Sequence, residues 1–400
     1  MSGVAWVEPA GSLRRAEETV GDIQMVVAAD APAATVDVVA QFPDFDRLLH
    51  TSARRVSAVI NRTQIGIRFE EPGNAGAALL HLTGSRAHFR ALQVRAAERG
   101  WRLTPEGLHA GDGRLSPAAS EDAIYAALAL PFIAPEIRNG EDEIAVAAGG
   151  RLPRLISRRD IRGDLHMHST WSDGQDSTEA MVTMCRDLGY EYIAITDHSA
   201  RSGLARALTE DNVLRQADEI AALRERFPEI GILHGCEMEI MPDGTLDFPD
   251  HVLATFDIVL ASLHQRDGQS PDRLLARYVG AMRHPLVTLI THPTNRMIPH
   301  RPGYDIDYDR LFEAAVDTGT FLEIDGAPGH LDMNGAMSRR AIAAGVSVAI
   351  DSDCHRAVFL ARQMDLGVAT ARRGWVEPRH VINSRPLADV RAAIARKRAS

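Results

Sequence analysis

The chain contains few of the residues that several kinds of protein chemistry require. Its 400 residues include three cysteines (Cys185, Cys236 and Cys354), an odd number without short spacing, which excludes a disulfide framework and a CxxC zinc knuckle. Lys397 is the single lysine, so a Walker A GK[ST] loop and a Schiff-base lysine are both excluded. No run approaches the ~18 apolar residues that span a bilayer, and the N-terminus lacks the pattern of a signal peptide. We therefore expect a soluble, cytoplasmic protein with no membrane partner.

Charge and histidine are unevenly distributed along this chain. The formal net charge of −10 argues against a protein that binds nucleic acid mainly by electrostatic attraction. Residues 1–160 hold 18 Lys+Arg against 20 Asp+Glu, whereas residues 161–400 hold 26 against 34 and 12 of the 16 histidines. A region rich in both histidine and carboxylate has the side chains that a metal site needs. The length predicts two or three domains at ~150 residues each.

From residue 161 onward, short apolar runs alternate with helical patterns. The apolar runs are predicted to be seven buried strands, at 161–168, 192–198, 230–240, 257–264, 286–292, 319–326 and 346–355. Helical periodicity covers 177–189, 209–227, 270–284 and 308–319, with Gly189 and Gly319 as stop signals. Nearly continuous apolar strands that alternate with helices indicate a parallel sheet covered by helices. Seven repeats favour a closed barrel over an open sheet.

The first part of the chain has a different pattern. Strands of a small mixed sheet are predicted at 21–29, 35–42, 55–61 and 63–71, and helices at 85–100 and 120–130. A charge run, a glycine pair and a proline between about residues 140 and 160 indicate a linker. We place the linker at 146–160, between an α+β region and the barrel of residues 161–400.

Imidazoles and carboxylates recur at the C-terminal ends of the predicted strands. His166 and His168 alternate on the first strand, and Asp353 and His355 alternate on the seventh, so each pair faces one side. In a parallel barrel these ends converge on one mouth, where barrel enzymes place their chemistry. The nine candidate ligands are His166, His168, Asp173, His198, Glu237, His264, His292, Asp353 and His355. Six imidazoles and three carboxylates exceed the needs of one four-coordinate ion, which predicts two or three divalent ions. Eight other histidines are interpreted as structural or solvated: His50, His88, His109, His234, His251, His284, His330 and His380.

Several motifs of this second part resemble those of the PHP (polymerase and histidinol phosphatase) domain, in the variant at the C-terminus of bacterial family X DNA polymerases. They are RGDLHMHSTWSDG, AITDHS, GCEMEIMPDGTLDFPD, ITHPTNR, LEIDGAPGHLDM and DSDCH. The resemblance implies a distorted, TIM-like (β/α)7 barrel and a trinuclear centre of Zn, Mn or Fe, with ligands at the same nine positions. It also implies a metal-bound water as nucleophile, with no separate protein nucleophile. Asp325-Gly326 replaces the usual Asn-Ala and Cys354 the usual Ala, and none of these is a ligand position.

The first part resembles the same polymerases as a degenerate, truncated, nucleotidyltransferase-like remnant. Residues 1–75 are similar to the palm and residues 76–145 to the thumb, with the segment 10–27 at the palm motif and 82–103 at the thumb motif. Of the three metal-binding aspartates of the palm, only Asp22 is retained, whereas Gln24 and Gly66 occupy the other two positions. An amide and a hydrogen cannot hold two Mg²⁺ ions. We therefore expect that polymerase activity is lost.

These observations predict a metal-dependent phosphoesterase, most simply one acting on DNA 3′ ends as a 3′–5′ exonuclease or 3′-phosphatase. A phosphatase of a small phosphomonoester, such as histidinol phosphate, and a non-catalytic DNA-repair adaptor remain alternatives, although complete ligand retention argues against the adaptor. Candidate phosphate contacts are Arg14, Arg15, Arg86, Arg90, Arg296 and Arg356. The sequence leaves open the physiological substrate, the metal and the oligomeric state.

Overall fold

A computed structural model describes residues 3–116, 118–203, 206–265 and 268–399. The chain forms two compact units, residues 1–153 and 154–400. The boundary lies within segment 146–160, whose first residues belong to helix α6 (Glu143–Ala148). Among the described residues, no helix is long and apolar enough to cross a membrane.

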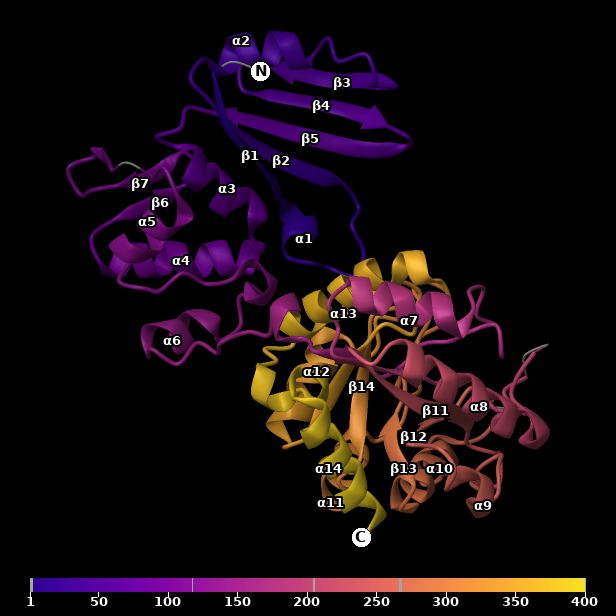
Figure 1. The fold of residues 1–400 in the computed structure, drawn as a ribbon. Coiled ribbons are helices and arrows are strands. Elements are labelled where there is room, and N and C mark those ends of the chain that lie inside the picture. The colour runs from indigo at the N-terminus through magenta and orange to yellow at the C-terminus, as the bar shows by residue number, and fades with distance from the viewer. Residues whose placement is uncertain (1–2, 117, 204–205, 266–267, 400) are drawn as a thin grey trace. The chain divides into compact units, whose positions relative to one another are not determined.

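The first unit is built around a five-stranded mixed sheet in the order β1-β2-β5-β4-β3 (Figure 1). Its central strands, β2 (Ile23–Ala29) and β5 (Thr63–Glu70), are parallel. The outer strands β1 (Val4–Ala10), β4 (Arg55–Ile60) and β3 (Arg47–Ser52) add antiparallel pairs. The sequence patterns identified β2, β4 and β5. They missed the edge strands β1 and β3, which have mainly exposed residues and no clear apolar alternation.

The predicted strand at 35–42 is wrong, because most of this segment lies in helix α2 (Pro32–Val39). Pro32 stands in the first turn, where its fixed φ suits a helix and its missing N–H is not needed. The two alanines that follow are strong helix formers. The alternating valines had suggested a strand, but on the helix they leave Val36 buried and Val38 exposed.

Helices and a small sheet complete the first unit. The remaining elements are α1 (Gly11–Arg14), α3 (Ala75–Thr83), α4 (Arg86–Glu98), α5 (Glu121–Ala127), η1 (Pro135–Ile137) and the sheet β6 (Arg102–Thr104), β7 (Gly107–His109) and β8 (Leu115–Ser116). The predicted helices at 85–100 and 120–130 correspond to α4 and α5. Their N-caps are Ser85 and Ser120, whose side chains accept hydrogen bonds from backbone N–H groups in the first turn.

The second unit is a nearly closed parallel barrel of seven strands, as the sequence predicted. The strands run in the order β15-β14-β13-β12-β11-β10-β9. Their bounds are β9 (Gly163–Asp164), β10 (Tyr192–Ile195), β11 (Gly231–Glu239), β12 (Ile258–Ser262), β13 (Val287–Ile290), β14 (Phe321–Asp325) and β15 (Val348–Asp351). Beyond the short β9, the first and last segments still meet, because Met167 forms a parallel bridge with Cys354 and the His168 N–H donates to the Cys354 carbonyl at 2.9 Å.

Helices surround this barrel (Figure 1). They are α7 (Thr178–Asp187), α8 (Glu210–Arg226), α9 (Asp250–Leu253), α10 (Pro271–Arg283), α11 (Tyr308–Thr318), α12 (Gly335–Ala343), α13 (Leu360–Arg373) and α14 (Leu387–Arg398), with short 3-10 turns η2 (Arg158–Asp160), η3 (Ala357–Phe359), η4 (Pro378–His380) and η5 (Ile382–Ser384). Helix α13 packs tightly on the end of β14: a Cβ at Gly326 would lie 2.0 Å from the Gln363 carbonyl oxygen. This close approach requires a residue without a Cβ at position 326.

Strand periodicity places the functional side chains. Tyr192 and Ala194 belong to an apolar cluster that includes Val390 and Ile394 of α14, whereas Ile193 and Ile195 pack with the residues of the surrounding helices. Side chains at every second position share a face. The apolar face of each strand therefore continues, at its C-terminal end, into the imidazoles and carboxylates at the mouth.

Candidate metal centre

Glu237 of β11 lies at the centre of the nine predicted ligands. Its carboxylate is 2.8 Å from His198 Nδ1, 2.9 Å from His292 Nε2 and 3.4 Å from His166 Nε2. It also lies 3.7 Å from His168 Nε2 and 3.8 Å from His264 Nε2. The Glu237 side chain has no solvent-exposed surface. One buried carboxylate thus contacts five imidazoles from the ends of four different strands.

The donor atoms fall into groups that could each hold an ion. Three groups use only predicted ligands: His168 with Asp173, His198 and His355; His166 with His168 and Asp353; and His198 with Glu237 and His264. Within each group, one donor atom per residue lies within 4.8 Å of the others. The structure therefore brings together eight of the nine predicted ligands in these groups, and the ninth, His292, joins them through Glu237.

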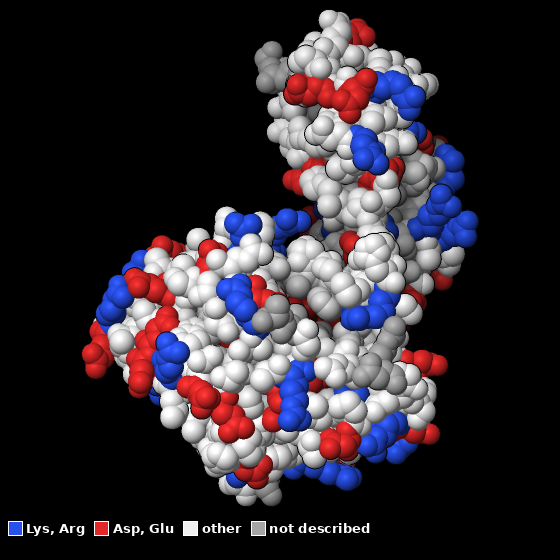
Figure 2. Space-filling view, turned by 90° about the vertical axis from the view of Figure 1, so that its right-hand side faces the viewer, with Lys and Arg blue, Asp and Glu red and all other residues white. Residues whose placement is uncertain are grey.

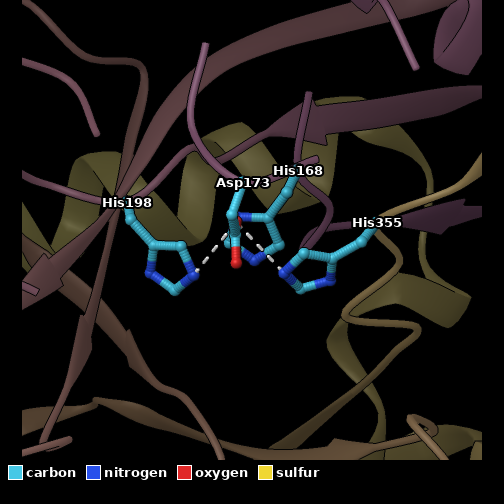
Figure 3. A group of neighbouring side chains, drawn as sticks. All are labelled: His168, Asp173, His198 and His355. Atoms are coloured by element: carbon cyan, nitrogen blue, oxygen red, sulfur yellow. Dashed lines mark ion pairs between the residues drawn. The ribbon is translucent and has the colours of Figure 1, made fainter. Parts of the chain in front are cut away.

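The first group is the most open to solvent. Figure 3 shows the rings of His198 and His355 turned toward the Asp173 carboxylate from two sides, with His168 beside them. The distances from Asp173 Oδ1 are 3.6 Å to His198 Nε2 and 3.2 Å to His355 Nε2. The side chains of Asp173 and His355 are about one-third exposed, whereas that of His168 is fully buried. A ligand can therefore reach this side of the centre from solution.

Two further carboxylates orient the predicted ligands, and the sequence analysis missed both. Glu323 Oε1 lies 2.6 Å from His166 Nδ1, and Glu239 Oε2 lies 2.8 Å from His264 Nδ1. Such bonds to the second ring nitrogen set the tautomer and orientation of a metal-binding histidine. Strand periodicity was an available signal, because Glu239 lies two positions after Glu237, and Glu323 lies two before Asp325.

β14 also contributes a fourth group, in which Asp325 and His330 join Asp353. The sequence pattern predicted no ligand on this strand and a structural or solvated role for His330. The structure places the His330 ring at the mouth, stacked on the ring of His292 with centroids 5.3 Å apart. The loop after β14 carries His330 to the mouth, a placement that its position in the sequence does not reveal.

The charges of the centre compensate one another. Burial by itself would lower the pKa of His166, but Glu323 and Glu237 outweigh it and raise that pKa well above its usual range. In the same way, His198 and His166 overcome the effect of burial and hold the pKa of Glu237 well below its usual range. Burial, with the positive charges of His355 and His198, lowers the pKa of His168 to about 3.

The geometry fits divalent cations. The Nε2 atoms of His166 and His168 face each other at 3.1 Å, and Asp353 Oδ1 lies 3.0 Å from His168 Nε2. Lone pairs that converge in this way need a proton or a cation between them. Mixed imidazole and carboxylate donors suit Zn²⁺, Mn²⁺ and Fe²⁺. The residues present therefore fit the metal centre that the resemblance implies.

The three palm positions of the first unit also lie together. Gln24 on β2 pairs with Gly66 on β5, and the Gln24 amide donates a hydrogen bond to Asp22 Oδ2. A Cβ at Gly66 would lie 2.5 Å from Gln24 Oε1. The Gln24 amide thus fills the space beside Gly66 and uses the one remaining carboxylate as its acceptor.

The arginines predicted to contact phosphate have different environments. Arg14 is bound to Glu121 and Thr83 (2.6 and 2.8 Å), and Arg15 donates to the Thr83 carbonyl, so both guanidinium groups are held by protein acceptors. Arg86 and Arg90 line a cavity of about 280 Å³.

A neighbouring cavity of about 290 Å³, which shares His81 and Pro105 with the first, is lined by Arg55 and Arg68. On the face shown in Figure 2, arginine side chains gather along one edge of the first unit, whereas charges of both signs alternate over the second.

The two predicted arginines of the second unit contact their own loops. Arg296 Nε donates to the His330 carbonyl at 2.9 Å, and the Arg356 guanidinium lies over the Phe359 ring, 5.6 Å from its centroid. Arg296 thereby tethers the loop that carries His330 to the mouth.

Comparison with known families agrees with this architecture. The family model of the DNA polymerase beta thumb matches residues 78–139, and that of the PHP domain matches residues 164–324. The PHP match includes seven of the nine predicted ligands, and Asp353 and His355 lie beyond it.

Individual relatives match either nearly the whole chain or about half of it. The DNA polymerase/3′-5′ exonuclease PolX of Bacillus subtilis is 39% identical over 97% of this chain and 68% of the relative. A probable phosphatase of Caldanaerobacter subterraneus is 29% identical over 48% of this chain and 75% of the relative. A probable phosphatase of Shewanella oneidensis is 28% identical over 49% of this chain and 77% of the relative. The chain therefore belongs to the bacterial family X DNA polymerases that carry a PHP domain, and its second unit is a metal-dependent phosphoesterase of the PHP type.

Proposed function

We propose that Glu237 and the eight predicted ligands around it hold two or three divalent ions and that this centre hydrolyses phosphoester bonds. The observation that carries the proposal is the contact of one fully buried carboxylate with five imidazoles. When bound, such ions supply Lewis acidity toward phosphoryl oxygens and lower the pKa of water to near neutrality. The nucleophile is then water, and no side chain of the chain forms a covalent intermediate.

The protein's own residues position and neutralise this centre. Glu323 and Glu239 keep His166 and His264 in the tautomers that direct their Nε2 atoms inward. Glu323 also accepts a hydrogen bond from the backbone N–H of His292 at 2.6 Å, which fixes the turn after β13. Asp173 and His355, at the solvent side, leave room for a phosphoryl group to enter.

We propose DNA 3′ ends as the substrate, cleaved by 3′–5′ exonuclease or 3′-phosphatase action. Three observations support this choice: the match to a polymerase thumb, the 3′-5′ exonuclease activity in the name of the Bacillus subtilis relative, and the arginine-lined cavities of the first unit. Arg86 and Arg90 lie one turn apart on α4, at a spacing that suits contacts to successive phosphates.

A second candidate is the hydrolysis of a small phosphomonoester such as histidinol phosphate. It is favoured by the relatives named as probable phosphatases, whose matches cover about half of this chain. A third, a non-catalytic DNA-repair adaptor, would not require the full set of candidate ligands that the structure brings together.

A substrate panel separates these functions. The full chain would be assayed with Mn²⁺ on 3′-labelled single-stranded DNA with 3′-hydroxyl or 3′-phosphate ends, on para-nitrophenyl phosphate and on histidinol phosphate. Preference for the DNA substrates supports the main proposal, and preference for histidinol phosphate supports the second. If the protein contains metal but hydrolyses none of these substrates, the result supports the adaptor role. Elemental analysis of protein purified without added metal would identify the ions.

We also propose that the first unit has lost templated nucleotide addition. Gln24 and Gly66 stand where two metal-binding carboxylates are expected. The Gln24 amide occupies the space beside Gly66 and donates a hydrogen bond to Asp22. Primer extension with Mg²⁺ or Mn²⁺ should therefore stay at background. Extension above background that Asp22→Ala abolishes would contradict this proposal.

A further inference from the structure

β14 and its following loop bring two additional metal-binding side chains to the mouth. Asp325 is the last residue of β14, and His330 lies in the loop that follows. A donor atom of each lies within 4.8 Å of the other and of a donor atom of Asp353. Asp325 and His330 belong to none of the three groups formed by the predicted ligands.

Asp325 has an unused donor atom at this place. Its side chain is completely buried, and Oδ1 accepts a hydrogen bond from the Ala327 N–H at 2.6 Å. Oδ2 is also buried, and among the described residues it has no hydrogen-bond partner. A buried carboxylate oxygen without a partner costs free energy unless a proton or a cation satisfies it. The nearby carboxylate of Asp353 makes it still less favourable for this oxygen to remain without a proton or a cation.

His330 is in a similar state. Its Nδ1 is buried and, within the described part of the chain, has no hydrogen-bond partner. The ring stacks on His292, and its backbone carbonyl accepts from Arg296 Nε at 2.9 Å. Two further hydrogen bonds hold this loop, from the Ile298 N–H to the Gly329 carbonyl at 2.7 Å and from the Thr294 N–H to Asp332 Oδ2 at 3.0 Å. The imidazole is therefore presented by a fixed loop.

We propose that Asp325, His330 and Asp353 form a fourth cation position of the metal centre, for a divalent ion with mixed nitrogen and oxygen ligation. This inference rests on the proposed phosphoesterase centre, because Asp353 belongs to both. Three protein ligands leave at least one coordination position for water or a phosphoryl oxygen. His330 is only partly buried, so solvent reaches one of the three residues of this group. Asn at position 325, usual in related domains, would supply a weaker neutral oxygen.

Metal stoichiometry tests this assignment. Three proteins would be equilibrated with Mn²⁺ over a range of concentrations: the full chain and the variants Asp325→Asn and His330→Asn. Elemental mass spectrometry would then measure the bound metal per chain. Asp325→Asn can keep the bond to the Ala327 N–H, so folding should survive. We expect each variant to bind about one equivalent fewer than the unaltered chain. The matched control Asp317→Asn, an exposed carboxylate on α11, should bind as much metal as the unaltered chain.

The outcomes separate this inference from the proposed function. Loss of one equivalent in both variants, with the other ions bound within about threefold of their original affinity, supports the fourth position. Equal stoichiometry and affinity in all proteins would overturn it and leave the three-group centre intact. If chelation leaves phosphoesterase activity unchanged in the unaltered chain, the proposed function itself has failed. Circular dichroism and thermal unfolding of the metal-free proteins identify any variant that has lost its fold, and the other variant then decides the result.

Discussion

Glu237→Gln is the sharpest perturbation of this protein, because the substitution keeps the shape of the side chain and removes its charge. The charge interacts with His198 and His292 at 2.8 and 2.9 Å. At an effective dielectric constant of ~20, a pair of unit charges at this distance attracts by ~6 kcal/mol before desolvation is subtracted. Removing one member of a buried charge pair costs about 3–5 kcal/mol net.

The same carboxylate would face divalent ions, so we expect an effect at least as large on metal binding. A loss of about 3–5 kcal/mol corresponds to a decrease of roughly 10²–10⁴-fold in affinity. Turnover at fixed Mn²⁺ should fall by ~10²-fold or more, the scale for losing one preorganised electrostatic partner. Mn²⁺ competition against a chelator measures the affinity, and release of para-nitrophenol measures the turnover.

Glu225→Gln, an exposed carboxylate of α8, is the matched control and should change neither quantity. Circular dichroism should show that the Glu237→Gln barrel remains folded, because its apolar clusters are untouched. If Glu237→Gln binds Mn²⁺ within threefold of the unaltered chain and turns over normally, the carboxylate is not at the centre of the site and the reasoning is refuted.

Three further predictions follow from single contacts. Asp353→Asn should weaken metal binding and lower kcat by ~10²-fold or more, whereas His380→Ala should change activity little; the reverse result in a phosphatase assay would show that the mouth is assigned wrongly. Burial lowers the pKa of His88, so the unfolded chain binds more protons and the first unit should lose stability as the pH falls below 6.5. Burial raises the pKa of Glu143, but hydrogen bonds from His88 and from the backbone together outweigh burial and lower this pKa, which adds to the loss at lower pH. Thermal unfolding between pH 5 and 7 tests this, and an unchanged pH dependence in His88→Gln would contradict it. Gly326→Ala should lower the free energy of unfolding of the second unit by about 1–3 kcal/mol, because its Cβ meets the backbone of α13; urea denaturation with no change in midpoint would disprove the close approach.

Sequence periodicity was sufficient wherever an element is amphipathic or fully buried. All seven barrel strands were identifiable because their apolar runs pack on both faces. Helices α7, α8, α10 and α11 were identifiable because their apolar residues repeat at the helical period, whereas α9, α12, α13 and α14 were not predicted. The first unit was less predictable. Edge strand β3 exposes all of its residues, and α2 contains valines spaced as in a strand, so local pattern and tertiary environment disagree there.

The sequence by itself determined which strands end in imidazoles and carboxylates, because a side-chain period of two in parallel strands sends those residues to one mouth. Only the tertiary structure decided which of them touch. The contacts of Glu323 with His166 span 157 residues, and no local rule relates them. The loop after β14 brings His330 to His292, and Thr83 and Glu121 hold Arg14 in the fold of the first unit. Distances between side chains on different strands depend on barrel closure and loop conformation, which are properties of the whole packed chain and of no single segment.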